Sequence, residues 1–307
     1  FTVGCAGGVT AECRLPVSYE EAEGISYTIK LSGLQGGHSG AEIDKGRANA
    51  IVEIGRVLKR IEDSAEIGIV SLNGGLKDNA IPREVLSEVL VAADQTAAFE
   101  AVITQLDGIL KKEYAASDAE ISLSAECNGE KKGQVTDYRS QTRMLFFLRN
   151  MPNGICNMST DVAGLPETSL NAGIMKLEKD CFSVSFSVRS SVPSRKENLM
   201  DRLDYLTGFL GGEAVFTGSY PAWEYKRDSK IRPLAQEVYR DLFKKEPIVE
   251  TIHAGLECGI LSEKIPDLDC ISFGPDNYDI HTPQERLSIS STERVWEFLI
   301  EMLKRAK

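Results

Sequence analysis

The sequence predicts an α/β fold in which two units with the element order βαββαβ share one long antiparallel sheet. Three observations support this prediction. Apolar and polar residues alternate over 25–31, as in a half-buried strand, and apolar residues then recur every three or four positions from Ala48 to Ile61, as in a helix. A related order of elements recurs as far as residue 217. From residue 218 onward the pattern changes, which indicates a second domain.

The first unit is expected between residues 24 and 125. A loop around Gly36-Gly37-His38 separates its first strand from its first helix, and Asn73 to Asp78 forms a turn between two later strands. The expected strands are 25–31, 67–73, 85–92 and 120–125, and the expected helices are about 45–62 and 95–115. Before this unit, residues 1–23 are interpreted as a short strand, a Gly-rich turn and an acidic loop.

The second unit is related to the first by the order of its elements rather than by sequence identity. Cys181 to Val188 alternates strictly, and Gly211-Gly212 is a stop signal for the helix before it. The expected elements are helices at about 137–150 and 195–210 and strands near 168–177, 181–189 and 213–217. Residues 24–217 are therefore predicted to form one duplicated domain.

Residues 218–307 have the pattern of the edge of an open α/β sheet. Helices are expected at about 229–245 and 291–306, with a buried strand from Leu268 to Phe273 and a loop after it that contains His281. Ligands bind beyond the carboxyl ends of the strands in such sheets. The loop that follows residue 273 is therefore a candidate binding segment.

Charge and composition exclude several classes of function. The chain of 307 residues carries a net charge of −11, which argues against a nucleic-acid surface. No apolar run approaches the ~20 residues of a membrane span. The seven cysteines form no Cys-x-x-Cys pair, which favours reduced thiols in the cytoplasm over a disulfide scaffold. Because the sequence begins at Phe1 as if inside a domain, we expect a piece of a longer protein.

The three histidines, His38, His253 and His281, all lie in predicted loops near glycine or proline. His38 sits in a glycine-rich strand-to-helix turn, where a ligand can approach the backbone closely, or it is incidental to a tight turn. His281 follows a strand and two aspartates, so it is either a metal ligand or an ordinary surface histidine. Composition and spacing leave these alternatives open.

Three further residues are candidates for a binding site. Arg189, at the end of an apolar strand, either pairs with a carboxylate or lies in solvent. Asn79 is a candidate ligand-binding or ordinary turn residue. Glu257 would share a helical face with His253, four residues before it, or it complements a helix N-terminus. No Gly-x-Ser-x-Gly elbow, phosphate-binding glycine loop or zinc-ribbon spacing is present in the sequence.

Five motifs in order resemble those of the aminoacyl-histidine dipeptidases, which act on Xaa-His peptides and belong to the co-catalytic zinc aminoacylase and carboxypeptidase superfamily. The resemblance covers essentially the whole chain and includes Cys5-Ala6-Gly7-Gly8. The motifs are Gly33 to Gly40 with Gly46 to Asn49, Asn79 to Glu84, His253 to Gly259, Ser272 to Pro275, and His281-Thr282-Pro283.

This resemblance implies a two-zinc hydrolase with a catalytic domain and an inserted lid domain. Residues 24–217 would be the lid, and residues 1–23 and 218–307 would be parts of the catalytic domain. In such enzymes a metal-bound water attacks the peptide carbonyl. The implied roles are oxyanion stabilisation for His38, zinc ligation for His281, substrate binding for Asn79 and for Arg189, which would hold the terminal carboxylate, and a place in the substrate pocket for His253, Gly255 and Glu257.

The sequence also departs from the pattern of this family. The other zinc ligands and the general base are expected upstream of Phe1, so the 307-residue chain should be inactive alone. Asp78 before Asn79, and Thr282-Pro283-Gln284 after His281, are smaller departures that leave fine specificity open. We therefore expect a cytoplasmic zinc dipeptidase with a possible homodimer contact through the lid, no nucleic acid and no membrane. The alternative is a non-catalytic lid module that binds peptides or dimerises.

Overall fold

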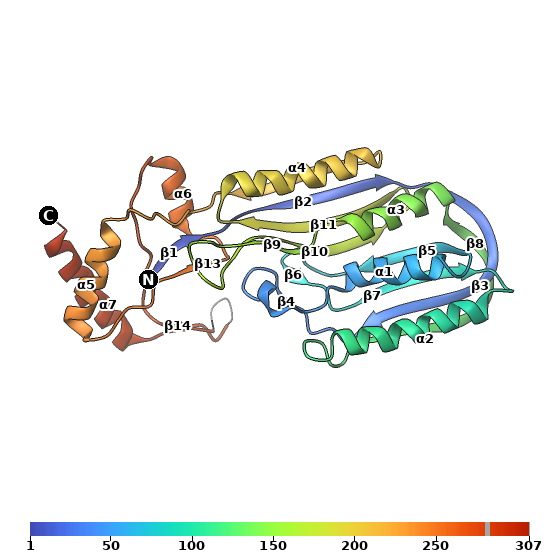
Figure 1. Ribbon diagram of the computed structural model, residues 1–307, viewed down its shortest axis with the longest axis horizontal. Helices are drawn as coiled ribbons and strands as arrows, with labels where there is room; N and C mark the ends of the chain where they lie inside the picture. The colour runs from blue at the N-terminus through green and yellow to red at the C-terminus, as the bar shows by residue number, and fades with distance from the viewer. Residues whose placement is uncertain (280–282, 307) are drawn as a thin grey trace.

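A computed structural model describes residues 1–279 and 283–306. The molecule is elongated, with a large sheet domain at one end and a smaller group of elements, which includes both termini, at the other (Figure 1). The sheet has nine strands in the order β12-β2-β11-β10-β5-β7-β3-β8, and the ninth strand, β9 (Gly154–Met158), pairs with β10. None of the described helices is long and apolar enough to cross a membrane.

The first predicted unit is confirmed. Its strands occupy half of the sheet in the order β5-β7-β3-β8, and Asn49 caps its first helix by accepting hydrogen bonds from the N–H groups of Ile51 and Val52. A short 3₁₀ helix, Ile43–Lys45, precedes that helix. The elements are β3 (Tyr19–Ser32), α1 (Ala50–Glu62), β5 (Ile67–Gly74), β7 (Val85–Val91), α2 (Thr96–Glu113) and β8 (Ser122–Thr136).

The second unit has the same topology, and an N-terminal segment completes it. The sheet order β12-β2-β11-β10 repeats that of the first unit, with β2 (Gly7–Pro16) as its first strand. The first unit is therefore inserted between β2 and the helix α3. The remaining elements are α3 (Tyr138–Asn150), β10 (Pro166–Leu177), β11 (Cys181–Ser190), α4 (Pro193–Phe209) and β12 (Glu213–Tyr220).

The interpretation of residues 1–23 as strand, turn and loop is wrong beyond the first strand. Gly7 is the first residue of β2, and a β-carbon there would lie 2.6 Å from the backbone nitrogen of Ala222. The glycine therefore permits a close backbone approach and does not form a turn. The acidic residues form the first half of β3, where Glu23 lies opposite Lys132 of β8. The domain boundary at residue 24 stays a prediction, although β2 belongs to the sheet.

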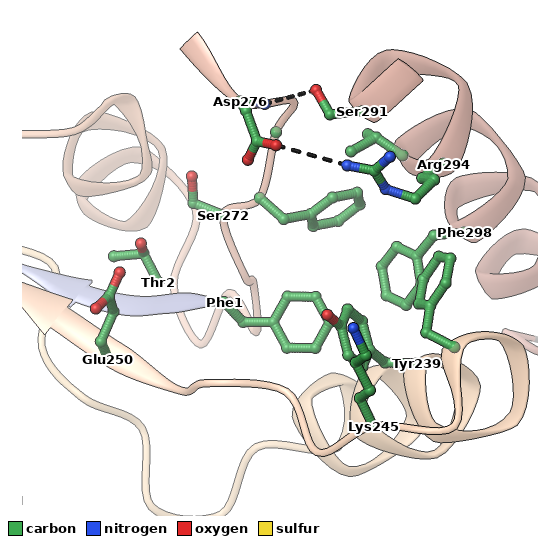
Figure 2. Close-up of a pocket in the computed structure, with 14 residues that line it drawn as sticks. Phe1, Thr2, Tyr239, Lys245, Glu250, Ser272, Asp276, Ser291, Arg294 and Phe298 are labelled. Carbon is green, nitrogen blue, oxygen red and sulfur yellow. Dashed lines mark hydrogen bonds and ion pairs between the residues drawn. The ribbon is translucent and has the colours of Figure 1, made fainter. Parts of the chain in front are cut away.

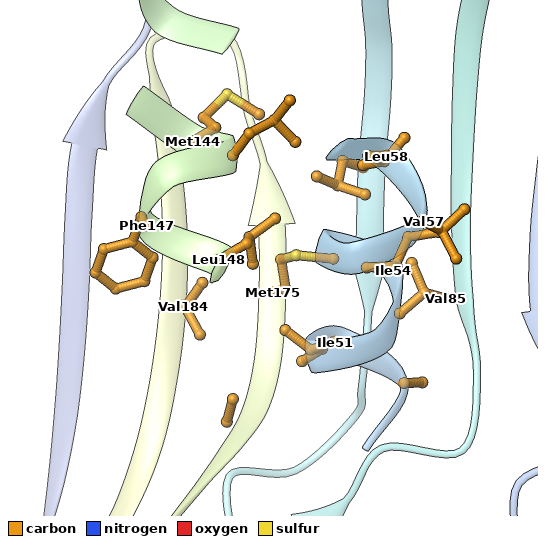
Figure 3. Close-up of a cluster of buried hydrophobic side chains, with 14 of the residues drawn as sticks. Ile51, Ile54, Val57, Leu58, Val85, Met144, Phe147, Leu148, Met175 and Val184 are labelled. Carbon is orange, nitrogen blue, oxygen red and sulfur yellow. The ribbon is translucent and has the colours of Figure 1, made fainter. Parts of the chain in front are cut away.

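Four helices, α1 to α4, pack on one face of the sheet and share one hydrophobic core with it. Figure 3 shows how the core crosses from one unit to the other, with α1 and α3 facing each other. A β-carbon on Gly55 of α1 would lie 2.7 Å from the β-carbon of Leu148 of α3, so this glycine allows the two helices to approach closely. In the sheet itself, only Met175↔Gly74 and Lys176↔Asn73 join β10 to β5.

The smaller group of elements contains the first and last parts of the chain. Strand β1 (Thr2–Cys5) pairs in parallel with β13 (Glu250–Ile252), and an aromatic cluster packs beside them. This cluster contains a cavity of about 550 Å³. Figure 2 shows Phe1, Tyr239 and Phe298 among the residues that line it. The other elements are α5 (Ile231–Phe243), α6 (Glu257–Lys264), β14 (Asn277–Tyr278), β15 (Arg286–Leu287) and α7 (Ile289–Arg305).

The predicted strand from Leu268 to Phe273 is wrong. Within it, only Ser272 forms a β-bridge, with Thr2. Ile271 and Phe273 instead pack against the aromatic cluster. Their apolar character therefore reflects packing of a loop and not the pairing of a strand.

Candidate functional site

The loop that carries His38 is shaped by two glycines with positive φ, Gly36 at 68° and Gly37 at 136°. Gly37 and His38 form the short strand β4, which pairs with β6 (Ala80–Ile81). Nδ1 of His38 accepts hydrogen bonds from the backbone nitrogens of Gly40, at 3.1 Å, and Ala41, at 3.0 Å. An accepting Nδ1 carries no proton, so the neutral ring holds its proton on Nε2 and is a hydrogen-bond donor there.

Hydrogen bonds hold the segment around Asn79 beside this loop. Asn171 Nδ2 donates to the carbonyl oxygens of Asp78, at 3.0 Å, and Ala80, at 2.9 Å, on the two sides of Asn79. The carbonyl of Asn79 accepts from the N–H of Ser39 at 2.9 Å. Its side chain is exposed. The unexpected Asp78 has a structural role, because its Oδ2 accepts a 2.8 Å hydrogen bond from the hydroxyl of Thr10 in β2.

Arg189 lies on the face of the sheet opposite the helices. Its neighbour Val188 is part of the core, and side chains alternate between the faces of a strand. Register pairs place four residues in one row across β12, β2, β11 and β10: Tyr220, Gly8, Arg189 and Ser169. Residues opposite one another in neighbouring strands share a face. The row therefore forms a floor on the face of the sheet opposite the helices.

The Arg189 side chain is buried, with only 8% of the residue exposed. Its Nη1 donates a 3.0 Å hydrogen bond to the hydroxyl of Tyr220, while its Nε has no partner. Arg189 forms no ion pair with any residue that the structure describes. Burial of an unpaired charge is costly, and an anionic ligand would offset the cost. The buried guanidinium of Arg189 is thus suited to binding a carboxylate.

His253 lies next to the row and is also buried. Its Nε2 is 2.7 Å from Oγ of Ser169, and its Nδ1 has no hydrogen-bond partner. Burial, with smaller contributions from the charge of Arg189 and from the nearby ring of His38, lowers the pKa of His253 from its ordinary 6.5 to about 4. Burial, followed by the charge of Arg189, also lowers the pKa of His38, against a smaller opposite effect of Glu42. Both rings are therefore neutral at pH 7.

The structure brings His38, Arg189 and His253 together, and it places the other sequence candidates differently. Gly255 lies against Tyr220, since a β-carbon there would be 2.8 Å from the ring. Glu257 is exposed at the start of α6, and the shared helical turn with His253 does not form, so the helix-terminus alternative describes it. His281 lies outside the described residues.

Three residues of this site went unnoticed in the sequence: Ser169, Asn171 and Tyr220. Ser169 and Tyr220 each contact a sequence candidate, and Asn171 contacts the residues on both sides of Asn79. These partners lie far apart in the sequence, so no local motif marks the three residues. Among residues 1–279 and 283–306, no three His, Cys, Asp or Glu side chains gather as metal ligands do. The described side chains alone therefore do not fit a zinc pair.

Residues 29–118 match the family described as the peptidase dimerisation domain. The matched range covers most of the first unit, and the second unit repeats its topology.

Two relatives extend the likeness beyond the peptidase dimerisation domain. The chain is 33% identical over 304 residues to the cytosol non-specific dipeptidase of Escherichia coli K12, and the match covers 98% of the chain and 62% of that protein. The crystal structure of aminoacylhistidine dipeptidase from Vibrio alginolyticus superposes with a TM-score of 0.94 at 31% identity, over 99% of the chain and 62% of that protein. The resemblance to the aminoacyl-histidine dipeptidases and the predicted α/β fold are therefore confirmed. The chain spans 62% of the length of both relatives.

Proposed function

We propose that this chain supplies the substrate-binding part of a metallopeptidase that hydrolyses dipeptides. The observation that carries the proposal is the buried Arg189, which has no anionic partner among the described residues and lies beside two neutral histidines. The terminal carboxylate of a short peptide matches the planar fork of an arginine. The names of the two relatives, both dipeptidases, support this choice of ligand.

The proposed roles follow from the protonation states. Arg189 holds the terminal carboxylate of the substrate, and the Nε2–H of His38 donates to the oxygen that becomes negative when the peptide carbonyl is attacked. His253, being neutral, lines the site without repelling the arginine. The exposed amide of Asn79 contacts the substrate, and Gly255 and Glu257 border the pocket. Histidine as the C-terminal residue of the substrate remains part of the proposal because one relative is an aminoacylhistidine dipeptidase.

Zinc is the proposed cofactor, and it would polarise the carbonyl and activate the attacking water. The residues present do not fit a zinc pair, because the described chain gathers no set of three ligands. His281, outside the described residues, is the one ligand that we propose here. The remaining ligands and the general base would have to come from residues beyond those of this sequence.

Two further features belong to the proposal. The peptidase dimerisation domain supports a homodimer formed through the lid. A cytoplasmic location is proposed because the Escherichia coli relative is a cytosol dipeptidase.

The test compares the complete gene product with the 307-residue chain, each assayed with zinc on free dipeptides. We expect turnover by the complete product and none above background by the chain alone, because the chain lacks a ligand set. Absence of hydrolysis by the complete product would favour the non-catalytic module. In that case, binding of a free dipeptide but not of its C-terminal amide, measured by calorimetry, would identify a peptide-binding lid.

A further inference from the structure

We infer that Tyr220 is a positioning residue that fixes the orientation of the Arg189 guanidinium, an inference that rests on the proposed role of Arg189. The two side chains come from β12 and β11, which are separated in the sheet by β2. They nevertheless meet in a 3.0 Å hydrogen bond from Arg189 Nη1 to the Tyr220 hydroxyl. A side chain on the intervening strand would normally stand between them.

Gly8 of β2 makes this contact possible. It lies opposite both Arg189 and Tyr220 in the register. A β-carbon on Gly8 would lie 2.4 Å from the hydroxyl oxygen of Tyr220 and 2.6 Å from the ring carbon that bears it. The tyrosine therefore lies across the position that a side chain of residue 8 would occupy. Only a glycine at residue 8 lets the phenol span one strand and reach the arginine.

The ring is held on a second side as well. A β-carbon on Gly255 would lie 2.8 Å from the ring of Tyr220, so the ring fits between two glycines from β2 and from the segment after β13. Lys196 Nζ donates a 3.1 Å hydrogen bond to the carbonyl of Tyr220 and fixes its backbone. The phenol is therefore rigid, and the hydrogen bond to it restricts the rotation of the guanidinium.

This restriction has a chemical consequence. One N–H of Nη1 goes to the tyrosine, and Nε is buried without a partner among the described residues, so we assign the edge formed by Nε and Nη2 to a ligand that enters this buried site. A carboxylate binds a guanidinium best through two parallel N–H groups on one edge. Tyr220 thus selects the edge that Arg189 presents, and the site favours peptides with a free C-terminal carboxylate.

The test uses Tyr220→Phe in the complete gene product, which keeps the ring and removes the acceptor. We expect KM for a free dipeptide to rise about tenfold, as for loss of one hydrogen bond to a charged group, with kcat within about twofold. The already weak reaction of the C-terminally amidated dipeptide should not change. In an Arg189→Lys background, Tyr220→Phe should raise KM no further, because both substitutions remove the same two-point contact of an oriented guanidinium with the carboxylate.

Gly8→Ala is a second route to the same result, because its methyl group would lie 2.4 Å from the hydroxyl oxygen of Tyr220 and would displace the phenol. Tyr205→Phe is the matched control, since Tyr205 is 80% exposed on α4. Equal losses on the free and the amidated dipeptide, or full additivity of Tyr220→Phe with Arg189→Lys, would overturn the inference.

One measurement separates this inference from the proposed function. The Nε–H nuclear magnetic resonance signal of Arg189, assigned by its loss in Arg189→Lys, requires no catalysis. We expect Tyr220→Phe to shift or broaden this signal in the 307-residue chain, whether or not the complete product hydrolyses dipeptides. An unchanged signal in a folded variant would exclude the positioning role even if the peptidase activity were established.

Discussion

The carbonyl oxygen of His253 lies 2.6 Å from the position that a β-carbon of Gly40 would occupy. Gly40 belongs to the loop that carries His38, and its N–H donates to the ring of that histidine. One glycine therefore joins the His38 loop to the buried His253 segment. Contact between two segments so far apart in the sequence holds the candidate site together.

Gly40→Ala should force these two segments apart. The clash is with backbone, which cannot move as the end of a flexible side chain can, so we expect a loss of about 1–3 kcal/mol in the free energy of unfolding. Urea unfolding of the 307-residue chain measures it. Gly108→Ala in α2, where a β-carbon meets nothing within 4 Å, is the control and should be neutral or stabilising. Equal stability of the two variants would contradict the contact.

His38→Ala in the complete gene product should lower kcat by about 10²–10³, the usual loss for one oxyanion donor. Zinc content should not change, because His38 is proposed as a donor through Nε2 and not as a ligand. His281→Ala should instead lose zinc and activity together. Elemental analysis of both variants separates the roles, and a loss of zinc in His38→Ala would show that the two histidines had been misassigned.

Arg189→Lys should raise KM for free dipeptides strongly, because a lysine cannot reproduce a planar two-point contact. A lost charge-assisted contact corresponds to roughly 1.5–3 kcal/mol. Steady-state kinetics on a free dipeptide and on its C-terminal amide measure the effect. The assignment fails if the free dipeptide is unaffected while the amide reacts more slowly.

Stability should fall as the pH falls from about 6.5 to about 4. The folded chain keeps His253 neutral down to a pKa of about 4, whereas the unfolded chain takes up a proton near the ordinary value of 6.5. Protons therefore favour the unfolded state over this range, by up to about 3 kcal/mol for this one group. The lowered pKa of His38 acts in the same direction.

The measurement is urea unfolding at several pH values between 7.5 and 4. His253→Gln has no proton to gain at this position, so its stability should depend less on pH. If both proteins lose stability in parallel as the pH falls, other groups are responsible for the pH dependence.

Periodic segments of the sequence predict the fold well, and its glycines are harder to interpret. Helices and strands with strict apolar patterns lie within a few residues of their expected places, as α1 and β11 do. Gly7-Gly8 was assigned to a turn because glycine usually interrupts strands. In the structure Gly8 belongs to a strand, and its missing side chain leaves room for Tyr220, which is far away in sequence.

The residues of the candidate site also differ in how well the sequence predicts them. Motifs identify His38 and His253, and its place at the end of an apolar strand identifies Arg189. Ser169 is recognised only by its contact with the distant His253. Tyr220 occupies its place only through the pairing of β12 with β2, a strand distant in sequence. A single sequence contains no record of that register. The strand expected at Leu268 to Phe273 failed for a related reason, since an apolar run can serve packing as well as pairing.

The insertion of the first unit into the second sets an order for folding during synthesis. Residues 19–136 are continuous, so the first unit can fold as soon as β8 has left the ribosome. Strand β2 is made before all of them, yet its partners β11 and β12 are among the last strands of the sheet to be translated. Its apolar face must remain uncovered through most of translation, and closing so long a loop is slow. The strand that carries Gly8, opposite Arg189, is thus the strand of the sheet that waits longest in synthesis for its partners.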